Sequence, residues 1–160
     1  MKKVEVKTNV VRILEQKKIE FNVYNYVDSN VVAGVDVANV LGKNPNLVFK
    51  TLVTVGKSNQ NYVFVLPVNK ELDLKKAALA VKEKNISMVK SKDLLDLTGY
   101  IHGGCSPIGM KKYFKTVFDN SAKDYEKILF SAGKIGYQVE LSLDDVSKVI
   151  SYTLSDLCED

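Results

Sequence analysis

The sequence of 160 residues lacks what several classes of protein require. It has no tryptophan, one histidine and only two cysteines, Cys105 and Cys158, so it supports neither a disulfide framework nor a Cys/His zinc cluster. No apolar run approaches the roughly 20 residues of a membrane-spanning helix, which argues against an integral membrane protein. Residues 1–7 lack the apolar stretch of a secretory signal, and we therefore expect a cytoplasmic protein.

Arginine is nearly absent as well, because Arg12 is the single arginine among 23 basic residues. The net charge of +4 is modest and does not by itself indicate a polyanionic partner. Glycine is concentrated in one region, since six of the nine glycines lie between residues 99 and 136 (Gly99, Gly103, Gly104, Gly109, Gly133 and Gly136). Glycine is used where the backbone turns sharply or approaches a ligand closely, so this clustering is a first indication of a site.

What is present is the composition of a folded domain, 46% hydrophobic and 26% charged, in which short helices and strands are interspersed. Helices are predicted after the N-cap Thr8, over 35–41 before Gly42, from the cap Asp73 to residue 81, between Ser91 and Gly99, from the cap Ser142 to residue 150, and in the tail after Tyr152. Strands are predicted over 19–26, 48–55, 62–68, 86–89, 114–119, 128–130 and 137–141. Few of these helices fall where βαβ crossovers need them. We therefore expect one α+β domain over 1–160, with a central mixed, partly closed, barrel-like sheet flanked by helices.

Lys50 is the most unusual single residue, because it interrupts the apolar strand Val48-Phe49-Lys50-Thr51-Leu52-Val53. With the side-chain period of a strand, it shares a face with Val48 and Leu52. Two interpretations stay open. Either the lysine reaches solvent from a strand end, or its ammonium lies at the floor of a cleft and binds a phosphate or carbonyl oxygen.

The glycine-rich segments are the second candidate site. The pair Gly103-Gly104, followed by Ser106-Pro107 and Gly109, is able to form a backbone cradle for a phosphate or a carbonyl, and a tight structural turn is the alternative. The segment fits neither the Walker pattern nor the dinucleotide-binding fingerprint. A similar loop, 131–136, ends a short strand. Two such loops and an in-strand lysine in one small domain favour a shared cleft.

A protein nucleophile is disfavoured by the sequence. His102 and Cys105 lie three residues apart in one loop, without a third orienting group nearby, whereas catalytic Cys/His pairs usually converge from distant segments. Tyr24 and Tyr26 fit strand packing as well as hydrogen bonding to a ligand. No paired carboxylates have a spacing typical of acid–base catalysis or metal binding. We therefore expect no metal and no cofactor.

Three motifs together resemble a known family. They are Phe49-Lys50-Thr51-Leu52, the stretch from Thr98 to Lys112 around Gly103-Gly104, and Ser131-Ala132-Gly133-Lys134. The match is collinear over nearly the whole chain, including 18–26 and 72–76. These residues resemble the YbaK/EbsC family of aminoacyl-tRNA deacylases, which are related to the editing domain of bacterial prolyl-tRNA synthetase.

The resemblance implies an enzyme that acts in trans on mischarged tRNA, with the members that hydrolyse Cys-tRNA(Pro), and often Cys-tRNA(Cys), as the nearest match. It implies that Lys50 is the residue without which deacylation is lost, and that Tyr26, Gly103, Gly104 and Ser131 line the substrate pocket. It further implies a substrate-assisted reaction, in which the cysteinyl thiol attacks its own ester carbonyl while the protein positions and stabilises. The expected partner is the 3′ acceptor end of an aminoacyl-tRNA, with prolyl-tRNA synthetase as a further candidate.

Two other functions stay open on the sequence alone. One is deacylation of Ala-tRNA(Pro) by a related pocket, and the other is a tRNA- or synthetase-binding module without turnover. His102 and Ala33 differ from the residues usual at these positions in the family, and a change of pocket shape there would alter substrate choice.

Overall fold

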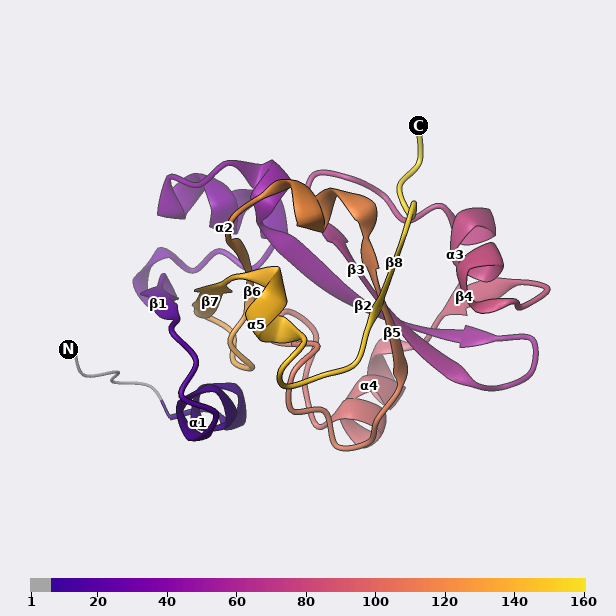
Figure 1. The fold of residues 1–160 in the computed structure, drawn as a ribbon, viewed down its shortest axis with the longest axis horizontal. Helices are drawn as coiled ribbons and strands as arrows, with labels where there is room; N and C mark the ends of the chain where they lie inside the picture. Colours follow the sequence, from indigo (N-terminus) through magenta and orange to yellow (C-terminus); the bar gives the residue numbers. More distant parts are fainter. Residues whose placement is uncertain (1–6) are drawn as a thin grey trace.

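The computed structural model describes residues 7–160, and residues 1–6, in which the sequence shows no signal segment, lie outside the described residues. Its strands are β1 (Asn22–Asn25), β2 (Phe49–Gly56), β3 (Asn61–Pro67), β4 (Ile86–Met88), β5 (Lys115–Asp119), β6 (Ile128–Ser131), β7 (Tyr137–Leu141) and β8 (Thr153–Ser155). Its α-helices are α1 (Asn9–Gln16), α2 (Gly34–Leu41), α3 (Leu74–Val81), α4 (Ser91–Thr98) and α5 (Leu143–Val146), joined by the short 3₁₀ turns η1 (Val27–Ser29), η2 (Pro45–Leu47) and η3 (Asn120–Asp124). The expected α+β class is confirmed (Figure 1).

The larger sheet has five strands in the order β4-β2-β3-β5-β8. Strands β2 and β3 form the antiparallel hairpin predicted around the turn at 56–59, with Lys50 opposite Leu66. The pairs β3–β5 and β5–β8 are parallel, so the sheet is mixed, as expected. The long β2–β3 ribbon forms the middle of the molecule (Figure 1).

The smaller sheet is antiparallel, in the order β1-β7-β6, and lies beside the start of β2 (Figure 1). A parallel bridge between Val48 and Leu129 joins the two sheets just before β2 begins. The expected partly closed sheet therefore consists of two sheets that meet at the first residues of β2.

The hydrophobic core lies mainly between the two sheets. Its buried side chains come from α1 (Val10, Leu14), from the larger sheet (Val63, Val65, Phe118) and from the smaller sheet (Ile128, Phe130, Val139). On the other face of the larger sheet, Phe64, Leu66 and Val117 pack against Ala77 and Val81 of α3. Burial of apolar surface on both faces holds β2 and β3 rigidly in the centre.

Most helix ends follow from local chemistry, as predicted. The Thr8 hydroxyl accepts the Val11 N–H, and the Asp73 carboxylate accepts the N–H groups of Lys75 and Lys76. These bonds satisfy donors that the first turn of a helix leaves free. Gly42 ends α2 in the left-handed conformation, with φ of 67°.

Three sequence predictions need correction. The tail after Tyr152 is not a helix. Thr153–Ser155 form β8, because their backbone groups pair in parallel with the otherwise unpaired edge of β5. The helix predicted to residue 150 is regular only to Val146, where turns begin. The strand predicted from residue 19 begins at Asn22, since Lys18 has a φ of 56° and the Ile19 N–H bonds back to the Leu14 carbonyl. Among the described helices, none combines the length and the apolarity needed to cross a membrane.

Candidate active site

A cavity of about 500 Å³ opens where the two sheets meet. One wall is formed by residues 48–53, which are Val48 and the first residues of β2. Another is formed at the start of α2 by Ala33, Gly34 and Val37. Further lining residues are Met88, Val89, Ser91, Leu94, His102, Gly103, Cys105, and Ser131 and Gln138 of the smaller sheet. This volume is typical of small-ligand sites, which lie in mostly apolar hollows with few polar groups.

Lys50 of β2 is among the residues that line this cavity. The side chain is 25% exposed, and its Nζ lies 3.8 Å from the Glu71 carboxylate. The strand is paired with β3 at this position, and the Lys50 side chain is partly exposed. Both interpretations left open by the sequence stay predictions, because Lys50 borders the cavity while its ammonium also reaches the exposed Glu71.

Tyr26 lies directly after β1 and is 5% exposed. Its backbone N–H donates to the Gly136 carbonyl at 2.8 Å, and its own carbonyl accepts the Ser29 hydroxyl at 2.6 Å. These bonds fix the chain where it turns toward α2, so that the Tyr26 ring forms part of the cavity wall.

The two glycine loops pack against each other at the cavity. Gly103 has a φ of 89°, which side chains rarely allow, and a Cβ on Gly104 would lie 3.2 Å from the Ile135 nitrogen. The Ser131 hydroxyl donates to the Gly104 carbonyl at 2.9 Å and accepts the Gly133 N–H at 3.0 Å. Gly103 and Ser131 line the cavity, whereas Gly104 lies behind the lining and supports it.

Neither candidate nucleophile is activated. Cys105 lines the cavity, but burial raises the pKa of its thiol to about 12, so the thiolate is scarce at neutral pH. The Ser131 proton is committed to the Gly104 carbonyl rather than to a base. Among the described residues that line the cavity there is no aspartate or glutamate, and no group of metal-binding side chains occurs within 7–160.

Two residues that line the cavity carry polar atoms that sequence reasoning missed. Within the described part of the chain, Thr51 Oγ1 and Gln138 Oε1 are buried side-chain oxygens with no hydrogen-bond partner. Gln138 is 7% exposed and stands between apolar neighbours in β7, which is the one sequence signal that was available. Buried polar groups are normally paired, so these two oxygens are candidate ligand contacts.

Tyr24, which the sequence left open, has a structural partner outside the cavity. Its hydroxyl donates to Glu140 at 3.1 Å, and the Lys43 ammonium lies 4.8 Å above its ring. Burial disfavours the Glu140 charge, but hydrogen bonds from Asn22 and Tyr24 and the charge of Lys43 outweigh it and lower the pKa of this carboxyl. Tyr24 therefore ties the smaller sheet to the end of α2.

The fold is that of a class of tRNA-editing proteins. Residues 28–149 match the model of the aminoacyl-tRNA editing domain. The chain is also 47% identical over 142 residues to EbsC of Enterococcus faecalis, a candidate Cys-tRNA(Pro)/Cys-tRNA(Cys) deacylase, covering 88% of this chain and 87% of that protein. The chain belongs to the aminoacyl-tRNA editing domain family.

Two solved structures share the fold. One is described as a candidate trans-editing enzyme for prolyl-tRNA synthetase, with a TM-score of 0.83 and 21% identity over 97% of this chain and 100% of that one. The other is a hypothetical protein, with a TM-score of 0.85 and 18% identity over 94% of this chain and 99% of that one. The family resemblance and the fold class expected from the sequence are thus confirmed.

Proposed function

We propose that the protein hydrolyses cysteinyl-tRNA in trans, with Cys-tRNA(Pro) as the main substrate and Cys-tRNA(Cys) as a second one. The observation that carries this proposal is the chemistry of the cavity: Lys50 supplies an ammonium, while the described lining has no carboxylate and a thiol that burial keeps protonated. A site with this lining positions the substrate and stabilises charge in the transition state without supplying the nucleophile. The substrate specified for the 47% identical relative agrees with it.

In the proposed reaction the nucleophile belongs to the substrate. The cysteinyl sulfur attacks the carbonyl carbon of its own ester, the bond from that carbon to the ribose oxygen breaks, and the thiol proton ends on the released ribose hydroxyl. Water then opens the cyclic thioester to give free cysteine. Lys50 stabilises the negative charge that develops on the carbonyl oxygen, or anchors the terminal nucleotide, and no general base is required.

The remaining residues have positioning roles in this proposal. Tyr26, Gly103 and Ser131 shape the wall against the terminal adenosine, and Gly104 supports that wall through its bond to Ser131. Thr51 Oγ1 and Gln138 Oε1 accept hydrogen bonds from the amino group of the bound cysteine.

We extend the proposal to the whole chain as one editing domain over 1–160. Support comes from both flanks of the matched region, because Val10 and Leu14 of α1 are buried in the main core and Leu157 of the tail is buried against the other sheet face. The reaction belongs to translation, which agrees with the expected cytoplasmic location. Since a cavity of about 500 Å³ has room for no more than the aminoacylated terminal nucleotide, prolyl-tRNA synthetase remains our candidate for the factor that selects the tRNA.

The test is a deacylation assay with tRNA(Pro) charged with cysteine, alanine or proline, with and without prolyl-tRNA synthetase. We expect release of cysteine only, because alanine and proline have no thiol for the internal attack. Release of alanine at a comparable rate would replace the proposal with an Ala-tRNA(Pro) deacylase. Unchanged half-lives of all three at saturating protein would indicate a binding module without turnover.

A further inference from the structure

Lys50 has an ion-pair partner that lies outside the cavity lining. Glu71 follows β3 in the segment before α3, and its Oε1 is 3.8 Å from Lys50 Nζ. The Glu71 side chain is 80% exposed, whereas that of Lys50 is 25% exposed. The pair therefore connects the charged group of the cavity to a carboxylate that is free to swing into solvent.

The backbone around Glu71 is held by the C-terminal tail. The Glu159 N–H donates to the Glu71 carbonyl at 2.9 Å, and the Asp73 N–H donates to the Leu157 carbonyl at 2.7 Å. Between these bonds, Leu72 and Cys158 form an antiparallel bridge. The tail thus fixes Glu71 at a distance from which its carboxylate reaches Lys50.

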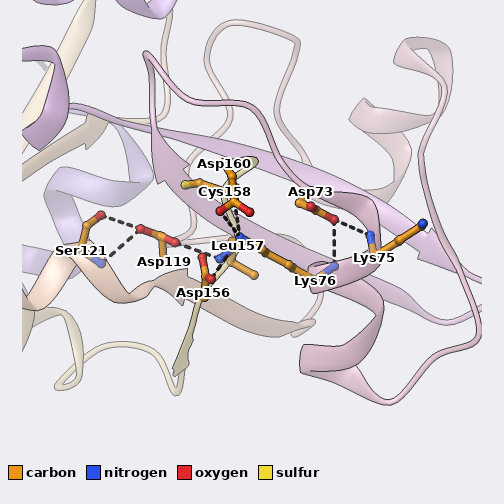
Figure 2. A network of polar contacts seen from close by, with 9 residues as sticks. All are labelled: Asp73, Lys75, Lys76, Asp119, Ser121, Asp156, Leu157, Cys158 and Asp160. Atoms are coloured by element: carbon orange, nitrogen blue, oxygen red, sulfur yellow. Dashed lines mark hydrogen bonds and ion pairs between the residues drawn. The ribbon is translucent and has the colours of Figure 1, made fainter.

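The tail itself is anchored by a polar network (Figure 2). Lys76 Nζ lies 2.7 Å from the Cys158 carbonyl, 3.1 Å from Asp156 and 3.1 Å from Asp160. Hydrogen bonds to the two carboxylates raise the pKa of Lys76 above its ordinary value. From the other side, the Asp119 carboxylate accepts the Leu157 N–H at 2.9 Å.

We propose that Glu71 is the counter-ion of Lys50 in the unliganded protein and acts as a positioning residue. The C-terminal tail, anchored by Lys76, holds Glu71 in this place. The proposal rests on the proposed function, because the group that replaces Glu71 is a phosphate of the bound tRNA end. An exposed ion pair is weak, so a substrate anion displaces Glu71 easily. Anions that contact only Lys50, such as the end of uncharged tRNA, must displace Glu71. They therefore bind less tightly than they would if Glu71 were absent.

This arrangement predicts a separation of kinetic constants. Glu71 opposes Lys50 binding to an anion only in the free protein, so its removal strengthens substrate binding and leaves the chemical step unchanged. We expect Glu71→Gln to lower KM for Cys-tRNA(Pro) by about two- to fivefold, the range of an exposed ion pair, with kcat unchanged. Inhibition by uncharged tRNA(Pro) should strengthen by the same factor.

The experiment compares Glu71→Gln with Glu71→Asp, which keeps the charge, and with Glu20→Gln as a matched control. Glu20 is exposed between α1 and β1 and takes part in none of the ion pairs observed within residues 7–160. Glu71→Asp and Glu20→Gln should keep the wild-type KM. An unchanged KM in Glu71→Gln, or an equal fall in Glu20→Gln, overturns the counter-ion role.

The tail is tested in the full chain by Lys76→Met, with the melting temperature measured beside the kinetics. We expect a fall in KM in the direction of Glu71→Gln, because the tail no longer fixes Glu71. A lower melting temperature with an unchanged KM overturns the link between tail and site. Binding of uncharged tRNA(Pro), followed by fluorescence anisotropy, separates the two proposals: if wild-type protein releases no cysteine, the proposed function fails, while tighter binding by Glu71→Gln still supports the counter-ion.

Discussion

Replacement of Lys50 by methionine tests the electrostatic role of the cavity most directly. Methionine keeps the length of the apolar stem, so β2 should retain its pairing with Leu66 and its packing. The variant removes only the ammonium from a side chain that is 25% exposed and belongs to a residue lining the cavity. Stability should therefore change little, and we expect a melting temperature close to that of the wild type.

The expected loss of rate follows from the environment of that ammonium. Removing one fixed donor that stabilises charge in a water-poor site costs about 10²–10³ in rate, or about 2.7–4 kcal/mol. Because Lys50 is partly exposed and solvent screens its charge, we take the lower end, a fall of about 100-fold in kcat/KM, equivalent to about 2.7 kcal/mol.

The assay is single-turnover release of radiolabelled cysteine from Cys-tRNA(Pro), with the melting temperature as the control for folding. Single turnover removes product release from the measured rate, so that the constant reports the bond-breaking steps. Activity within threefold of the wild type in a folded Lys50→Met protein would refute the assignment of charge stabilisation to Lys50. The cavity would then act through shape alone.

Three further predictions follow from groups around the site. Cys105→Ala should retain deacylation within about twofold, because burial raises the pKa of that thiol to about 12; a loss of activity at unchanged melting temperature would restore a thiolate mechanism. Burial disfavours the Asp119 charge, but hydrogen bonds from Ser121 and Leu157 lower its pKa overall, so its stabilisation is present above the unfolded value of 3.8 and is lost as the pH falls. Asp119→Asn should cost about 1.5–3 kcal/mol of unfolding free energy at pH 7. The unfolding free energy, measured by urea titration at a series of pH values, should then fall less steeply toward acid pH than in the wild type; an unchanged fall contradicts this. Gln138→Leu should leave the free protein as stable or more stable while raising KM, and equal losses of stability and activity would show that Gln138 serves folding only.

The parts of the fold that the sequence predicted well depend on neighbouring residues. A hydroxyl or carboxylate that accepts an N–H two or three residues ahead, as at Thr8 and Asp73, is visible in any short window. The left-handed end of α2 at Gly42 is equally local. The hairpin of β2 and β3 follows from two apolar runs around one turn.

The parts that the sequence did not predict depend on distant pairing. Strand β8 has three residues and no pattern of its own, and it is extended because the edge of β5 offers it partners. Likewise Gln138 resembles an ordinary polar strand residue until the junction of the two sheets brings it to the same cavity as Thr51. The pairing of Glu71 with Lys50 depends on where the C-terminal tail packs, and no local sequence pattern predicts that position.

The two unpaired oxygens bear on the proposed preference of the cavity for an aminoacyl ester over a simple anion. An unsatisfied buried oxygen costs about 1–3 kcal/mol, a large part of a stability of about 5–15 kcal/mol, so a fold keeps such a group where a ligand pairs with it. The amide oxygen of Gln138 only accepts hydrogen bonds, so a phosphodiester, which has no donor to offer, leaves it unsatisfied. In the proposed function, a bound aminoacyl end meets both requirements at once, with an amino group as donor for Gln138 and Thr51 and a carbonyl oxygen that gains negative charge beside Lys50. On this proposal, acceptor oxygens and an ammonium in one cavity favour a ligand that carries both groups, as an amino acid held by its ester does.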